Sequence, residues 1–107
     1  MHCYFMLTYS VHQNIPKNQR SEDFADFVRK EIANFDKVWD KVEHIETTFT
    51  GVLTVTGITD ADRKIDARKQ VRAKISPILK KVPEMYLPTV NVALMLENNG
   101  SFIEFEI

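Results

Sequence analysis

The sequence predicts an α+β domain in which two helices cover one face of an antiparallel sheet. Three observations support this prediction: apolar runs at residues 3–11 and 90–96, two amphipathic segments within 21–35 and 60–82, and apolar-polar alternation at 103–107. The chain has 107 residues, 44% of them hydrophobic and 27% charged. Because this length and composition suffice for a core of its own, we predict that residues 1–107 form a single domain.

The first apolar run is predicted to be a strand inside the sheet. Its residues are apolar on both parities, which is typical of a strand with both faces covered. One face carries Cys3, Phe5, Leu7, Tyr9 and Val11, and the other carries Tyr4, Met6 and Thr8.

A first helix is predicted to begin at Ser21, whose hydroxyl can cap it, with Glu22 and Asp23 in the first turn. Its apolar stripe consists of Phe24, Phe27, Val28, Ile32 and Phe35. From residue 37 to 58 the period changes to that of strands. We predict a hairpin there, with its turn at Thr50-Gly51.

A second helix is predicted to start at Asp60 or Asp62. Its expected buried residues are Ile65, Val71, Ile75, Ile78, Leu79 and Val82. Pro77 opposes one continuous helix because proline removes a hydrogen bond and clashes with the preceding turn. We therefore expect either a kink at this position or a new short helix capped by Ser76.

The remaining segments complete a known strand order. Residues 83–88 read as a connector, residues 90–96 as a strand, residues 98–100 as a turn and residues 103–107 as a half-buried last strand. The order is β-α-β-β-α-β with one extra C-terminal strand, which is the ferredoxin-like pattern. In this topology the face of Tyr4, Met6 and Thr8 points away from the helices. We predict that a second copy covers it in a homodimer; the alternative is that the last strand or the 83–88 connector folds over it.

Positive charge is concentrated in the second helix. Residues 60–82 hold eight basic and three acidic residues, a net of +5, whereas residues 83–107 hold four acidic residues and no basic one. Lys64, Arg68 and Arg72 recur at i, i+4 spacing, and Lys69, Lys80 and Lys81 are expected to extend the charged surface. Such a row suits the phosphate backbone of RNA or DNA. A solvated helix face is the structural alternative.

Several classes are disfavoured by composition. Cys3 is the single cysteine, so neither an internal disulfide nor a cysteine-based zinc site is expected. No apolar run reaches the length of a membrane span, and no secretory signal is recognised at the N-terminus, which favours a cytoplasmic location without membrane contact. The glycines are scattered, so no phosphate loop and no cofactor are expected.

Three short stretches carry a family resemblance: residues 4–9 (YFMLTY), residues 39–49 with Ile45-Glu46-Thr47-Thr48-Phe49, and residues 101–107 (SFIEFEI). They resemble a group of small ferredoxin-like proteins that includes the CRISPR-associated subunit partnering the spacer integrase, its stand-alone relatives and the GhoS-type antitoxin ribonuclease. The resemblance implies a dimer that binds nucleic acid, in some members with metal-dependent ribonuclease activity.

The chain departs from the nuclease members of this group at the end of the first strand. Those members carry an aspartate where this chain has Ser10 or Val11, and serine does not hold Mg²⁺ as a carboxylate does. No metal site is therefore predicted. Ser10 and His12 remain as candidate catalytic residues, since an imidazole titrates near neutral pH. His44 and Glu46 are expected to share a face of the second strand.

The sequence therefore predicts a dimeric, nucleic-acid-associated protein with weak or absent nuclease activity. The alternative is a protein-interaction module, such as an antitoxin, an immunity protein or a phage-encoded inhibitor. This module would meet its partner through Glu43, Glu46, Glu104 and Glu106.

Overall fold

The computed structural model describes residues 1–37, 39–45 and 47–107. Its elements are β1 (His2–His12), α1 (Gln19–Ala33), the 3-10 helix η1 (Asn34–Lys37), β2 (Asp40–Lys41), β3 (Thr48–Thr54), α2 (Asp60–Leu79), the 3-10 helix η2 (Glu84–Tyr86), β4 (Thr89–Leu96) and β5 (Ile103–Glu106). The strands form one antiparallel sheet in the order β2-β3-β1-β4-β5. The α+β class and the ferredoxin-like order with an extra strand at the β4 edge are confirmed.

The central strand β1 has one buried and one exposed face. Every odd-numbered residue from Cys3 to Val11 is buried, and every even-numbered residue from His2 to His12 is exposed. Because side chains alternate along a strand, the helices need to cover only one face. The prediction that both faces of β1 are covered is wrong for the single chain.

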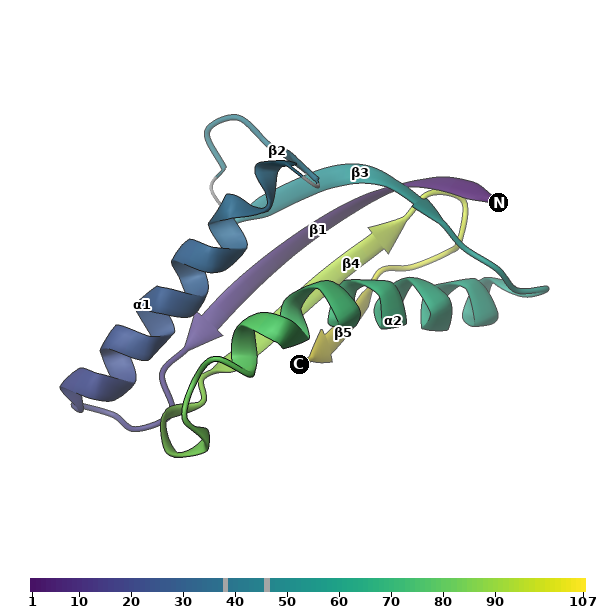
Figure 1. Cartoon of the computed structure of the whole chain (residues 1–107). Coiled ribbons are helices and arrows are strands. Elements are labelled where there is room, and N and C mark those ends of the chain that lie inside the picture. The colour runs from purple at the N-terminus through teal and green to yellow at the C-terminus, as the bar shows by residue number, and fades with distance from the viewer. Residues whose placement is uncertain (38, 46) are drawn as a thin grey trace.

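Both helices cover the face that carries the odd-numbered residues of β1, and Figure 1 shows α1 and α2 on the same side of the sheet. Val28 and Ile32 of α1, and Val71 and Ile75 of α2, are 0% exposed and belong to one core with β1. The two helices approach each other over the sheet. The core therefore lies between one helical layer and one sheet layer.

The cap of α1 differs from the predicted one. Asn18 is the N-cap, and its Oδ1 accepts a hydrogen bond from the Ser21 backbone N–H at 2.9 Å. Ser21 instead lies inside the helix, is fully buried, and accepts from the backbone N–H of Ile15 at 2.9 Å. The prediction of Ser21 as the cap is wrong because a residue three positions earlier supplies a better-placed side-chain oxygen.

The predicted turn at Thr50-Gly51 is also wrong. Gly51 lies in the middle of β3, opposite Phe5, and the reversal occurs earlier, after the two-residue strand β2. A Cβ placed on Gly51 would lie 2.8 Å from Cε1 of Phe5. Any larger residue at this position would therefore force the Phe5 ring to shift, and glycine leaves that ring its space.

Helix α2 runs from Asp60 to Leu79 with Pro77 inside it, so the prediction of a new short helix capped by Ser76 is wrong. Its N-cap is Thr59, whose hydroxyl accepts from the backbone N–H of Asp62 at 3.1 Å. Pro77 has no N–H to donate to the carbonyl four residues earlier, so the helix continues past it with one backbone hydrogen bond fewer. Ile65 was predicted to be buried but is 49% exposed, and Ala67 faces the core instead.

Neither predicted internal cover lies over the second face of the sheet. Strand β5 extends the sheet edge-on beside β4, and η2 packs against α1, where Tyr86 stacks on Phe24 with ring centroids 5.5 Å apart. The face of the sheet that points away from the helices, here called the open face, is therefore uncovered in the single chain.

Candidate functional site

One end of the open face is apolar. Tyr4 and Met6 of β1, Val52 of β3 and Met95 of β4 are 66%, 49%, 51% and 53% exposed. The register places Tyr4 opposite Val52 and Met6 opposite Met95, so these four side chains form one patch across three strands. They line a hollow of about 540 Å³. Two of the three predicted dimer-face residues, Tyr4 and Met6, lie in this patch.

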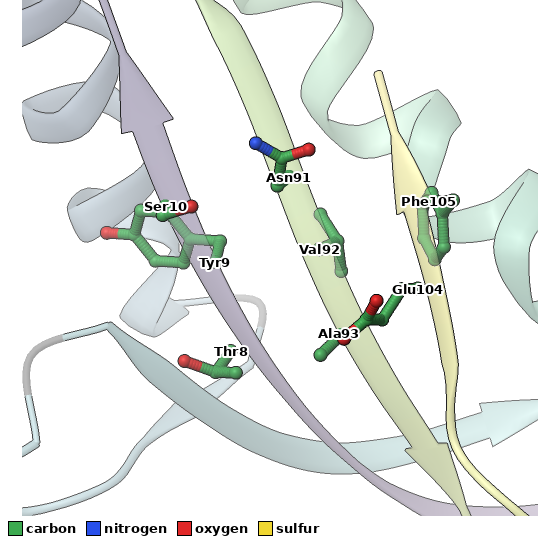
Figure 2. Close-up of a pocket in the computed structure, with 8 residues that line it drawn as sticks. All are labelled: Thr8, Tyr9, Ser10, Asn91, Val92, Ala93, Glu104 and Phe105. Atoms are coloured by element: carbon green, nitrogen blue, oxygen red, sulfur yellow. The ribbon is translucent and has the colours of Figure 1, made fainter.

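The other end of the open face is polar. Two cross-strand rows run from β1 to β5, one made of Thr8, Ala93 and Glu104 and one of Ser10, Asn91 and Glu106. Figure 2 shows these side chains, apart from Glu106, around a shallow hollow of about 320 Å³. Thr8, the third predicted dimer-face residue, belongs to this polar end.

The predicted catalytic residues Ser10 and His12 lie together at the polar end. Ser10 Oγ and His12 Nε2 are 3.2 Å apart, at i, i+2 positions on the exposed side of β1. The arrangement holds a hydroxyl and an imidazole within hydrogen-bonding distance, which is one part of an activated nucleophile. Both groups are exposed to solvent, so water competes with any substrate for the hydroxyl and the imidazole.

The second histidine candidate is not on a strand. His44 lies in the loop after β2 with a φ of +67°, and its Nε2 is 3.3 Å from Oε1 of Glu43. Both side chains are 87% exposed. Glu46 lies outside the described residues. The expected shared face of His44 and Glu46 on the second strand is therefore not found, because β2 ends at Lys41.

The predicted cationic residues Lys64, Arg68 and Arg72 follow one another along the side of α2 that lies beside β5. We call them the α2 row. Lys64 and Arg68 line a hollow with Ile103 of β5, and Arg72 Nη2 donates to the backbone carbonyl of Glu106 at 2.9 Å. The rise of an α-helix separates successive members by about 6 Å.

The other predicted cations extend away from this row. Lys69 is turned by about 100° from Arg68 around the helix axis. Lys80 is the C-cap of α2, and Lys81 follows it. All three side chains are exposed. The six predicted residues therefore share one helix and its end but not one face.

Ion pairing leaves the α2 row available. Within residues 1–37, 39–45 and 47–107, the pairs of oppositely charged or ionisable side chains are Arg29–Asp26, Arg63–Asp60 and the contact of His44 with Glu43, which is an ion pair only when the histidine is protonated. The side chain of Arg63 is only 15% exposed and also donates to Asn99 Oδ1, so it connects the start of α2 to the turn after β4. The three residues of the α2 row take part in none of these pairs.

The predicted acidic surface is divided by the fold. Glu104 and Glu106 are exposed on the open face of β5, whereas Glu43 lies beyond β2 at the opposite edge of the sheet. These acids therefore make two separate surfaces.

Sequence reasoning missed a second cationic site, formed by Arg29 and Lys30 of α1 and Lys41 of β2 around a hollow beside β1. These residues are separated by a loop and a change of element, so no local spacing in the sequence signals their meeting.

Comparisons of the chain with family models, with curated proteins and with solved structures gave no match. In the parts of the chain that the structure describes, neither helix combines the length and the apolar character needed to cross a membrane.

Proposed function

We propose that this protein is a nucleic-acid-associated protein that acts as a homodimer, of the kind found among the CRISPR-associated and antitoxin proteins that it resembles. The observation that carries the proposal is the α2 row: Lys64, Arg68 and Arg72 follow one helix without a carboxylate partner among the described ion pairs. A row of unpaired cations binds polyanions by releasing condensed counterions, which is a sequence-independent source of affinity.

The open face supports the homodimer. Tyr4, Met6, Val52 and Met95 expose apolar surface on neighbouring strands, and the chain's own last strand and connector leave it uncovered. Burying apolar surface gains roughly 25 cal/mol per Å². A second copy offers a patch of the same chemistry, so face-to-face packing of two sheets removes both patches from water.

We propose weak or absent nuclease activity. The end of β1 offers Ser10 and His12 in place of a carboxylate, and this pair is exposed. The carboxylates in the cross-strand rows of Thr8 and Ser10, Glu104 and Glu106, belong to β5, two strands away.

The proposal is tested by fluorescence anisotropy of labelled single- and double-stranded RNA and DNA at several salt concentrations. R68Q/R72Q is expected to weaken binding by about tenfold and to reduce the slope of log affinity against log salt by about 2, since each lost phosphate contact removes about one unit. The matched control is R20Q/K74Q, which removes the same charge at exposed positions outside the row.

A wild-type protein that binds no RNA or DNA at low salt would contradict the proposal. Equal weakening by R68Q/R72Q and R20Q/K74Q would also contradict it, because net charge rather than the row would then account for binding. R68Q alone serves as a second variant, since Arg72 also holds the carbonyl of Glu106.

A second candidate function is a protein-interaction module. It is favoured by one observation: the exposed carboxylates Glu104 and Glu106 lie on the same open face as the apolar patch, and a polar border around an apolar centre is common at protein interfaces. A pull-down with the protein tests this function. If it recovers a basic enzyme without nucleic acid, and the recovery is lost in E104Q/E106Q but retained in R68Q/R72Q, this function is favoured over the first.

A further inference from the structure

The C-terminal end of β1 has an unpaired edge. Strand β3 begins at Thr48, opposite Thr8, and the Tyr9 N–H still donates to the Thr47 carbonyl at 3.1 Å. Beyond this point β1 pairs only with β4, up to His12. The unpaired edge faces a hollow of about 530 Å³ between α1 and β2, here called the edge pocket.

Among the described residues, the charged side chains that line the edge pocket are cations: Arg29, Lys30 and Lys41, which come from two elements. No described carboxylate lines it. The hollow beside the α2 row differs in this respect, because Asp60 and Glu104 lie in its wall with the two cations. The edge pocket therefore has the more uniform positive field.

The three cations are not equally engaged. Arg29 is held by Asp26 and donates through Nη2 to the carbonyl of Val11 at 2.7 Å. Lys30 and Lys41 take part in none of the ion pairs found among the described residues, and both are exposed. Arg29 is thus held in place at one side of the pocket, and the two lysines are available to bind an anion.

The backbone adds a donor. In an antiparallel strand the N–H and C=O of one residue point to the same side. The Val11 carbonyl accepts from Arg29, which lines the edge pocket, so the Val11 N–H is directed to this same edge, where β3 supplies no partner. Backbone N–H groups and cationic side chains are groups that bind oxyanions in proteins through charge-assisted hydrogen bonds.

We propose that the edge pocket is a binding site for a phosphate-type anion. Lys30 and Lys41 supply the charge, Arg29 the fixed wall and the Val11 N–H a directed hydrogen bond. The anion is free phosphate, the phosphate of a mononucleotide or the 5′-phosphate of a nucleic acid, since all present the same oxygens. The proposal is independent of the α2 row, because α1, β1 and β2 build the pocket.

The test is an amide NMR titration of the full chain with inorganic phosphate, with chloride adjusted to keep the ionic strength constant. We expect a saturable shift of the Val11 amide signal. K30Q/K41Q is expected to weaken this binding by about tenfold, whereas R68Q/R72Q leaves it unchanged. Both lysines are exposed, and circular dichroism of each variant verifies the fold.

Absence of a saturable shift at Val11, or a shift with the same affinity in K30Q/K41Q, overturns the proposal. If phosphate does bind at Val11, titrations with adenosine monophosphate, and with one oligonucleotide that carries either a 5′-phosphate or a 5′-hydroxyl, distinguish the possible sources of the bound phosphate. A preference for the 5′-phosphate that is lost in K30Q/K41Q assigns the site to nucleic-acid ends. If phosphate binds at Val11 but the protein binds no oligonucleotide, the phosphate site is supported and only the proposed nucleic-acid function is contradicted.

Discussion

On the helix-covered face of the sheet, Phe5 and Leu7 of β1 are 3% and 1% exposed, and on the open face their chain neighbours Tyr4 and Met6 are 66% and 49% exposed. The residues on both faces are large and apolar. On one face they are buried by α1 and α2, and on the other they remain in water. The chain therefore has more apolar sheet surface than its own helices can cover, and this surplus is a reason to expect a partner.

The open face is itself divided. Its end near Tyr4 and Met6 is apolar, and its end near Ser10 carries hydroxyl, amide and carboxylate side chains on β1, β4 and β5. Cations are grouped elsewhere, on α2 and in the edge pocket. The proposed contacts with a second copy and with a polyanion would therefore lie on different sides of the molecule.

The largest expected contrast is between adjacent residues of β1. Leu7→Ala leaves a cavity in the core and is expected to lower the free energy of unfolding by about 2–5 kcal/mol. Met6→Ala, on the open face, is expected to lower the free energy of unfolding by less than about 1 kcal/mol, measured at protein concentrations low enough for the protein to be monomeric. Urea denaturation followed by tryptophan fluorescence compares the two, and equal losses would contradict the two-faced description.

Gly51→Ala tests the packing of β3 against β1 on the covered face. The added methyl group would lie 2.8 Å from Phe5 Cε1, so the ring must shift. We expect a loss of about 1–3 kcal/mol in the free energy of unfolding, measured by the same denaturation. A neutral result would show that Phe5 has room to move, and that glycine is not required there.

Thr59→Ala tests how α2 is held over the sheet. Removing the hydroxyl that accepts from the Asp62 N–H is expected to cost about 1 kcal/mol of unfolding free energy. Thr59→Ser keeps the cap and is the matched control. If T59S destabilised the protein as much as T59A, the methyl group rather than the cap would be responsible.

Strand positions and amphipathic helices were predictable because their periodicity is local. The spacing of Val28 and Ile32 marks the covered face of α1 directly. The first apolar run predicts a strand but not which face is covered, because it is apolar on both parities. The turn assigned to Gly51 was wrong because the reason for that glycine is a ring on another strand. Such a contact has no signal within the segment itself.

The candidate sites divide in the same way. The α2 row was predictable because i, i+4 spacing within one helix places its members on one side. Ser10 and His12 were predicted only as separate candidates, with His12 in a loop beyond the strand, and they lie together because β1 extends to His12 and i, i+2 residues share one face of a strand. The edge pocket was not, since Arg29, Lys30 and Lys41 meet only when α1 and β2 are placed beside β1.

The open face can be tested directly by sedimentation equilibrium of the wild-type protein and of Met6→Lys across a range of concentrations. The account predicts that the wild type associates to twice the mass of one chain, and that Met6→Lys remains monomeric with an unchanged circular dichroism spectrum, because a lysine at this exposed position interrupts the apolar patch without entering the core. A wild-type protein that stays monomeric at every concentration, or a Met6→Lys variant that associates equally well, would contradict the assignment of the open face as the contact between two copies.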